Sequence, residues 1–224
     1  MTMAYYPVFL DIRGKDCLVV GGGPVGARKA VTLERSGARV KIISDRFSVR
    51  ADELNKASIC FVTKEYEKDD LKGMFLVFAA TNNADLNQQI KDDALAFNIL
   101  CNVVDAPDNS DFLVPSTVER GKLILAVSTS GSSPALAKKI RQDLEGQFGP
   151  EYSKMLQLMG NIRKKLLSSG HNPDGHKAIF HTLIDKGLVE LIRSDDEEKI
   201  DAVLHEVLGK GFIYQDLVSL RSDQ

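Results

Sequence analysis

Short apolar runs alternate with helix-like segments over the first half of the chain. The runs "CLVVG", "RVKIIS", "ICFVTKE", "MFLVFAA" and "ILCNVV" carry apolar residues at consecutive positions, and segments of helical character at 24–36 and 84–97 lie between them. Consecutive apolar positions are typical of parallel strands that are covered on both faces. The pattern therefore predicts an α/β fold built on a doubly wound parallel sheet.

The second half of the chain follows a different pattern. The strand-like runs "FLVPS" and "KLILAVSTS" precede a helix that Ser133 can cap and Pro134 can begin. After the break "FGP", the stretches "EYSKMLQLMGNIRKKLLSS", "GHKAIFHTLIDKG" and "DEEKIDAVLHEVLGKG" have helical spacing. We predict a Rossmann-like domain over residues 1–112, a small α+β region over 113–148 and a helical C-terminal domain over 149–224.

Composition and charge exclude several classes of protein. With 224 residues, 43% hydrophobic and 27% charged, the chain can build a sizeable core. A net charge of −2 gives no general attraction to nucleic acid or to anionic lipid. No apolar run approaches the roughly 20 residues that span a bilayer, and the N-terminal stretch lacks the pattern of a signal peptide. We expect a cytoplasmic protein that binds neither nucleic acid nor membranes.

The cysteines and histidines do not form a metal-binding pattern. The three cysteines lie in apolar segments and lack close pairing, so we predict buried reduced thiols at Cys17, Cys60 and Cys101. The four histidines all lie in the tail, and no two have the i, i+4 spacing of a helical zinc pair. We predict solvated or packing roles and no resident metal for His171, His176, His181 and His205.

A glycine motif follows the first predicted strand directly. The stretch "GGGPVGARKA" contains Gly21-x-Gly23-x-x-Gly26 and feeds into a helix. In that position the glycines permit a tight turn, and the N–H groups at the helix start face a pyrophosphate. The motif predicts dinucleotide binding, and we expect the cofactor to contact Gly21, Gly22, Gly23, Pro24, Val25 and Gly26.

Residues after the second and fourth strands extend this predicted cofactor site. Asp45 ends the second strand and can accept from the ribose hydroxyls of NAD, whereas Arg46 can attract the extra phosphate of NADP; we favour NAD. Small residues end the fourth strand, where a cofactor passes close to the backbone, and Asn82 or Asn83 can cap the next helix. We therefore add to the cofactor contacts Ala80, Thr81 and Asn82.

An acid closes the fifth predicted strand, in "ILCNVVDAPDNSDFLVPS". Asp105 stands where ligands bind in open sheets of this type, but a strand-end aspartate also commonly caps a turn. Asn102 either fixes that turn or touches the cofactor, and we count it among the cofactor contacts. Asp108 and Asp111 are interpreted as solvated turn residues.

These motifs together resemble the precorrin-2 dehydrogenase/sirohydrochlorin ferrochelatase family of sirohaem biosynthesis. The resemblance rests on "YPVFLDIRGKDCLVVGGGPVGARKA", "GARVKIIS", "FAATNNADLNQQI", "CNVVDAPDNSDFLVPS" and "LILAVSTSGSSPALAKKIRQDLE", which have the family's order and spacing. It implies a homodimer, formed in part by the 113–148 region, that uses NAD to oxidise precorrin-2 to sirohydrochlorin. Some members also insert ferrous iron, and certain relatives carry a methyltransferase domain that we expect this short chain to lack.

The resemblance also gives roles to particular residues. Asp105 aligns with the family's general acid/base, and a flat substrate together with Val103 and Val104 is expected to desolvate it and raise its pKa. The substrate carries several carboxylates, so an anion site is expected on Ser128, Thr129, Ser130, Ser132, Lys138 and Arg141. The alternative for that segment is a capped helix with a solvated basic face.

Two departures from the family pattern affect the expected sites. The second strand ends "ISDRF" where many members read like "VAPE", which bears on the ribose contact. The loop "STSGSSP" lacks the two adjacent glycines of many relatives, which bears on the loop's shape.

A different class of function also fits part of the sequence, because "GGGPVG" with "AATNNADLN" resembles NAD-binding regulatory domains that act as sensors. The acid at Asp105 and the helix after "SGSSP" favour the enzyme.

Overall fold

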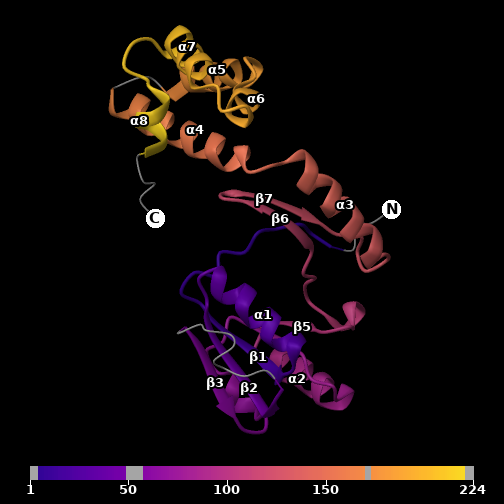
Figure 1. The fold of residues 1–224 in the computed structure, drawn as a ribbon. Coiled ribbons are helices and arrows are strands. Elements are labelled where there is room, and N and C mark those ends of the chain that lie inside the picture. Colours follow the sequence, from indigo (N-terminus) through magenta and orange to yellow (C-terminus); the bar gives the residue numbers. More distant parts are fainter. Residues whose placement is uncertain (1–4, 49–57, 170–172, 220–224) are drawn as a thin grey trace. The chain divides into compact units, whose positions relative to one another are not determined.

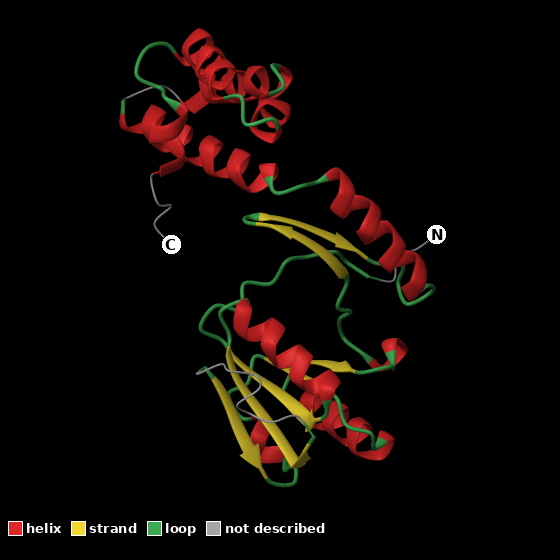
Figure 2. Ribbon diagram, viewed as in Figure 1, coloured by secondary structure: helices red, strands yellow, loops and turns green. Residues whose placement is uncertain are grey.

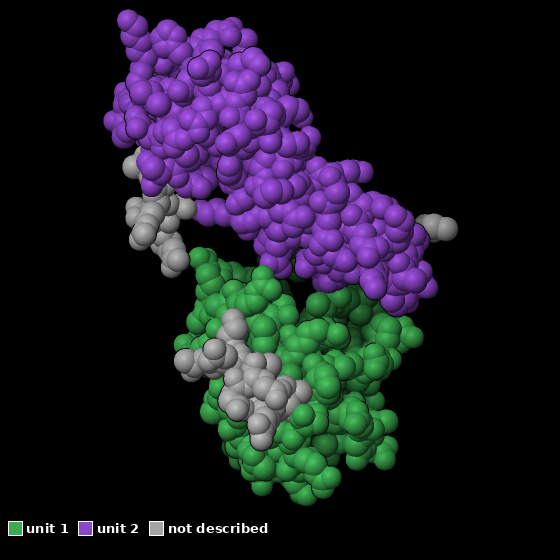
Figure 3. Space-filling view, in the orientation of Figure 1, with its two compact units in different colours: residues 1–114 green, residues 115–224 purple. Residues whose placement is uncertain are grey.

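The computed structural model describes residues 5–48, 58–169 and 173–219. The chain divides into two compact units, Met1–Val114 and Pro115–Gln224, which are coloured separately in Figure 3. Each unit has its own elements, drawn in Figures 1 and 2, and is described by itself below. None of the described helices is long and apolar enough to cross a membrane.

The first unit is a five-stranded parallel sheet in the order β3-β2-β1-β4-β5. The strand order confirms the predicted doubly wound sheet, because the connections reverse direction between β1 and β4. Helices α1 and α2 accompany the sheet (Figure 1). The strands and helices span β1 (Asp16–Gly22), α1 (Pro24–Arg35), β2 (Arg39–Phe47), β3 (Ile59–Thr63), β4 (Leu76–Ala79), α2 (Ala84–Ala96) and β5 (Leu100–Val103).

Buried apolar side chains cover both faces of this sheet. Alternate residues of β1 point to opposite faces, as the pleat requires. Leu18 and Val20 join a cluster that includes Ile90 of α2, whereas Cys17 and Val19 join another that includes Ala30 of α1. The sheet is therefore a middle layer between two apolar layers, which explains the continuous apolar runs in the sequence.

The predicted burial of the cysteines is correct for two of the three. Cys17 and Cys101 are buried, and burial raises the pKa of each thiol to about 11. Cys60 is exposed, so its predicted burial is wrong. It lies on β3, which is an edge strand of the sheet, and there an apolar run does not guarantee cover on both faces.

The second unit begins with a β-hairpin and continues in helices. Strands β6 (Ser116–Arg120) and β7 (Leu123–Val127) pair in antiparallel fashion, and Gly121 turns the chain with a φ of 58°. A two-stranded hairpin is only marginally stable alone, and here α3 packs against it. The helices are α3 (Pro134–Gln147), α4 (Glu151–Ser168), α5 (Pro173–Asp185), α6 (Leu188–Arg193), α7 (Glu197–Leu208) and α8 (Tyr214–Ser219).

The tail of the second unit is helical, as predicted. An apolar cluster with Leu158, Ile162, Leu183 and Leu204 at its centre joins α4 to the helices that follow. The sequence pattern missed the short helices α6 and α8, which have six residues each and too few turns for a clear period. The division of this unit at residue 148, and with it a separate dimerisation region, stays a prediction.

Candidate functional site

The glycine turn is packed so tightly that three of its four glycines exclude any side chain. A Cβ on Gly21, which has a φ of 128°, would lie 2.3 Å from the Ala80 carbonyl oxygen. A Cβ on Gly26 would lie 2.1 Å from the carbonyl oxygen of Gly21. The end of β4 and the first turn of α1 are therefore held directly against the turn.

Gly23 differs from its neighbours because it faces open space. A Cβ there would meet no atom within 4 Å, whereas a Cβ on Gly22 would lie 2.5 Å from the Arg46 carbonyl oxygen. The helix that starts after Gly23 has no side-chain cap and no acidic residue in its first turn, and Pro24 occupies its first position. Open backbone at an uncapped helix start is the arrangement that accepts a phosphate. These residues fit a dinucleotide cofactor.

The end of β2 lies beside the same turn. Gly22 pairs with Phe47, and the N–H of Ser48 donates to the Gly22 carbonyl at 3.0 Å. β2 continues to Phe47, two residues beyond its expected end at Asp45, so Arg46 also belongs to the strand, and Asp45 and Arg46 are both exposed. Either side chain is accessible to the ribose end of a bound nucleotide, and the choice between NAD and NADP stays a prediction.

The loop between β4 and α2 is held by an asparagine that sequence reasoning missed. The hydroxyl of Thr81 donates to Asn87 Oδ1 at 2.7 Å, and Asn87 Nδ2 donates to the Thr81 carbonyl at 3.0 Å. Asn87 is buried, so these bonds fix the loop backbone. Asn83 caps α2 by accepting from the N–H groups of Asp85 and Leu86, and Asn82 is exposed. Of the two expected capping candidates, Asn83 is the cap.

Asp105 follows β5 and occupies an unusual backbone conformation. The N–H of Val104 donates to the Ala79 carbonyl at 3.0 Å, which places Asp105 next to the end of β4. Because Ala80 touches Gly21, the acid and the glycine turn lie at the same edge of the sheet. Asp105 has a φ of 62°, in the left-handed region that aspartate, asparagine and glycine tolerate.

Val103 and Val104 alone do not bury the Asp105 carboxylate, and its expected desolvation together with a bound substrate stays a prediction. Asp105 is exposed, and Val103 is directed into the apolar layer on the α2 side of the sheet. The side chains of a strand alternate between faces, so an apolar strand does not cover the residue that follows its end. The carboxylate is thus free to meet a ligand.

The segment after Asp105 folds back onto β5 through three side chains. Asp111 is exposed in a bend, as expected, but it also accepts from the Cys101 N–H at 2.9 Å and pairs with Lys91, so it fixes the turn as well. Ser110 Oγ accepts from the Val103 N–H at 2.9 Å. Asn102 Nδ2 donates to the Phe112 carbonyl at 2.8 Å. Of the two roles expected for Asn102, fixing the turn or touching the cofactor, this bond corresponds to the first. Asp108 is exposed, as expected.

Lys29 is a further charged group near Asp105, and sequence reasoning did not single it out. Its ammonium lies 5.4 Å from the centre of the Phe78 ring, and Phe78 packs edge-on against Phe112. Burial lowers the pKa of Lys29, Arg28 lowers it further, and the negative charge of Asp105 opposes both.

The expected anion-binding residues of the second unit form a compact loop before α3. Ser130 has a φ of 52°, and its N–H donates to Ser128 Oγ at 3.1 Å. Thr129 Oγ1 accepts from the Ser133 N–H at 3.1 Å, and Ser133 caps the helix by accepting from the Leu136 N–H, as predicted. The hydroxyls of this loop therefore shape it by local bonds, and Ser130 adopts a backbone conformation that usually favours glycine.

The positive charges on α3 are not equally available to an anion. Arg141 pairs with Glu145 one turn later, which offsets its charge. Lys138 and Ser132 are exposed. The start of the helix and Lys138 are thus the parts of the expected anion site that stay accessible, whereas Arg141 is engaged within its own helix.

No group of three or more potential metal ligands comes together within the described ranges. His176 is buried, His181 and His205 are exposed, and His171 lies outside the described residues.

Family models match most of this architecture. An NAD(P)-binding family model covers residues 8–116, and the model of the family described as "Sirohaem biosynthesis protein central" covers residues 120–147. A relative named "Siroheme synthase" from Nitrosococcus oceani is 34% identical over 212 residues, which are 94% of this chain and 45% of that relative. The chain is similar to sirohaem synthases over almost all of its length. This similarity includes both the glycine turn and the 128–141 segment.

Further comparisons agree with this similarity and give the fold. "Siroheme synthase" from Methylobacillus flagellatus is 34% identical over 97% of this chain and 47% of its own length. The chain spans less than half the length of these curated relatives. A solved structure described as "SirC, precorrin-2 dehydrogenase" matches with a TM-score of 0.73 and 25% identity, over 88% of this chain and 100% of that chain.

Proposed function

We propose that this chain oxidises precorrin-2 to sirohydrochlorin with NAD. The observation that carries the proposal is the position of Asp105, which lies at the sheet edge that the open glycine turn also occupies. The name of the structural relative, a precorrin-2 dehydrogenase that is matched over its whole length, supports the same reaction. A location in the cytoplasm stays a prediction.

The oxidation removes one hydride and one proton from the substrate. The nicotinamide cofactor supplies the hydride acceptor, and the protein must supply the proton acceptor. Asp105 is exposed at the end of β5 and takes the proton on its carboxylate. The Lys29 ammonium lies near enough to interact electrostatically with that carboxylate. We assign Asp105 as the catalytic residue and Lys29 as a positioning residue.

The cofactor is held by the glycine turn and the start of α1. Gly23 admits the pyrophosphate, and the free N–H groups of Val25 and Gly26 face it. Asp45 accepts from the ribose hydroxyls, which favours NAD over NADP because a carboxylate repels a ribose phosphate. Replacing Asp45 with alanine should reduce the preference for NAD, measured as the ratio of kcat/KM for the two nucleotides; an unchanged ratio would remove Asp45 from the ribose site.

The second unit supplies the dimer contact and part of the substrate site in this proposal. Ile124 of the hairpin and Leu136 and Ile140 of α3 are exposed apolar residues, and a second copy of the chain can cover them. Lys138 and the N–H groups at the start of α3 then receive substrate carboxylates. Light scattering of the purified protein tests the dimer, and a monomer at micromolar concentration would contradict it.

Insertion of ferrous iron into sirohydrochlorin requires the release of two pyrrole protons. Asp105 is chemically able to accept these protons as well, so one carboxylate can serve both steps. Anaerobic incubation of sirohydrochlorin and ferrous iron with and without the chain decides whether this second reaction occurs, because the spontaneous rate is the control.

The main experiment is turnover of precorrin-2 by the purified chain with NAD. The NADH absorbance band should appear together with sirohydrochlorin. Nucleotide binding without turnover would contradict the proposal and would favour a regulatory NAD-binding domain.

A further inference from the structure

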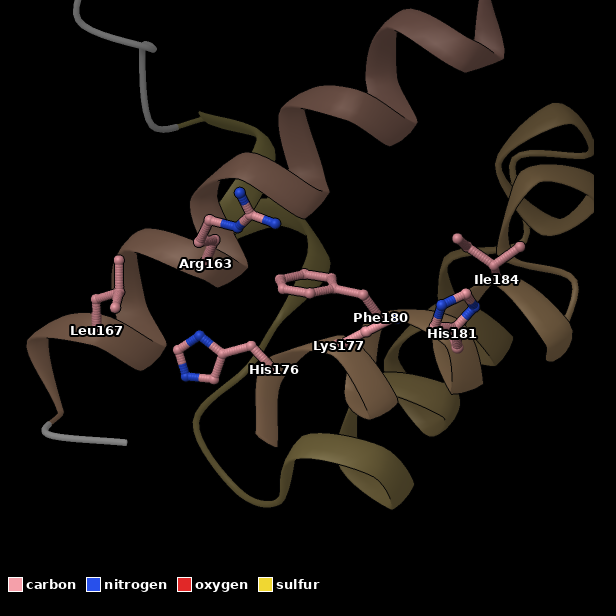
Figure 4. A pocket seen from close by; sticks show the side chains of 7 residues that line it. All are labelled: Arg163, Leu167, His176, Lys177, Phe180, His181 and Ile184. Atoms are coloured by element: carbon pink, nitrogen blue, oxygen red, sulfur yellow. The ribbon is translucent and has the colours of Figure 1, made fainter. Parts of the chain in front are cut away.

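A cavity of ≈ 440 Å³ lies between α4 and α5 in the helical tail. Its volume is within the range of sites for small molecules. Two of its lining residues come from α4 and five from α5, and Figure 4 shows their side chains between the two helices. They are Arg163, Leu167, His176, Lys177, Phe180, His181 and Ile184.

The described lining of this cavity is basic and apolar. Arg163, Lys177 and the two histidines carry the nitrogen donors, and no acidic side chain is among the described lining residues. The Arg163 guanidinium lies 5.3 Å from the centre of the Phe180 ring, which holds it in place by a cation–π contact. A fixed guanidinium without a lining carboxylate is a ready partner for an anion.

His176 provides a second and independent indication of a ligand. Its side chain is buried with a residue exposure of 6%, and its ring packs edge-on against Phe180 with centroids 6.5 Å apart. Its Nε2 has no hydrogen-bond partner, and no other buried side-chain nitrogen or oxygen of the described residues is left unpaired in this way. Buried polar atoms are normally satisfied, so an unpaired one on a residue that lines a cavity calls for a partner.

The apolar lining determines what the anion must be attached to. Phe180 extends from α5 toward Arg163, and the imidazole of His176 lies beside it toward Leu167 (Figure 4). Leu167 and Ile184 are each about half exposed, at 51% and 52%. An inorganic ion would leave these surfaces in water, whereas an organic acid would cover them.

We propose that the α4–α5 cavity binds an organic carboxylate whose apolar body packs on Phe180 and Leu167. Arg163 and Nε2 of His176 hold the carboxylate. The proposal does not depend on the reaction proposed above. The carboxylate has two sources with the same chemistry: a side chain of a tetrapyrrole, or a separate small organic acid.

The test measures binding to the full chain by calorimetry and by NMR of the histidine side chains. The probes are 3-phenylpropionate, its neutral amide, inorganic phosphate and sirohydrochlorin. Phenylpropionate should bind at least about tenfold more tightly than its amide and should shift the His176 resonances, because one charge-assisted hydrogen bond contributes at least that factor. The proposal would be overturned if phenylpropionate and its amide bound equally tightly. It would also be overturned if neither phenylpropionate nor sirohydrochlorin showed saturable binding.

Two variants and one control locate the site. Arg163→Met keeps the apolar stem and His176→Phe keeps the ring, and each should weaken phenylpropionate binding about tenfold or more. His205→Gln, on α7 and outside the cavity lining, should leave binding unchanged. Thermal unfolding shows that the variants are folded, and unchanged affinity in both cavity variants would place the ligand elsewhere. If sirohydrochlorin also binds and its binding is lost in the same variants, the natural ligand is a tetrapyrrole side chain. If only phenylpropionate binds at this cavity, the natural ligand is a separate small organic acid.

Discussion

Replacing Asp105 tests the proposed chemistry, and the choice of replacement follows from the backbone. At a φ of 62°, alanine would be strained by about 1–2 kcal/mol, whereas asparagine adopts this conformation more easily. Asp105→Asn therefore removes the carboxylate and leaves the turn intact. Asp105→Ala combines the chemical change with a change in stability and serves as the comparison.

The expected effect on turnover follows from the role of a general base. Such a group contributes roughly 10²- to 10⁴-fold in rate, so Asp105→Asn should raise the activation free energy by about 3–5 kcal/mol. Nucleotide affinity should stay within about twofold, since Asp105 is not part of the glycine turn. Melting temperatures should be similar for Asp105→Asn and the unchanged protein and lower for Asp105→Ala.

Three measurements on the same protein samples decide the matter. The rate of NADH formation with precorrin-2 gives kcat and KM, calorimetry gives the nucleotide Kd, and thermal unfolding gives stability. Lys29→Met is the matched probe of the neighbouring charge and should lower kcat less than Asp105→Asn does. If Asp105→Asn keeps a kcat within threefold of the unchanged protein, Asp105 is not the proton acceptor.

Three other predictions concern the scaffold around the site. Gly26→Ala should destabilise the protein by about 1–3 kcal/mol in denaturant unfolding, because its Cβ would lie 2.1 Å from a backbone oxygen. Gly23→Ala should fold normally and bind NAD more weakly. Equal stabilities of the two variants would contradict this packing. A thiol reagent should modify Cys60 quickly in the native protein and leave the two buried thiols, whose pKa is raised by burial, unmodified until unfolding; rapid labelling of all three would refute it. Asp70 is buried, which by itself raises its pKa, but a backbone N–H and two lysine ammonium groups lower the pKa below its usual value. Its contribution to stability should therefore be complete above about pH 4 and be lost as the pH falls through the lowered pKa, so that Asp70→Asn is destabilising at pH 7 and nearly neutral at pH 2.

The strands of the parallel sheet and the longer helices were predictable from the sequence because each depends on local patterning, whereas the six-residue helices α6 and α8 were not. The strands of the sheet repeat apolar residues, and the glycine turn and the cap at Ser133 have short-range signatures. The edge position of β3, and hence the exposure of Cys60, depends on strand order, which no single run encodes.

The candidate site was predictable in part for the same reason. Asp105 follows from the end of a strand, and its placement near the glycine turn follows from the topology. Asn87 and Asp111 bond to segments six and ten residues away, and nothing in their own neighbourhood distinguishes them from surface residues. Lys29 was missed because its environment is made by Phe78 and Phe112 from elsewhere in the chain.

Helix α1 links two tasks in one rigid element. In the proposed site its first turn faces the nucleotide, and Lys29 lies about 7.5 Å further along the same axis, given 1.5 Å per residue. Thermodynamic coupling follows, because any shift of the helix start on nucleotide binding also moves the ammonium relative to Asp105. A double-mutant cycle of Gly23→Ala and Lys29→Met should thus be non-additive in nucleotide affinity.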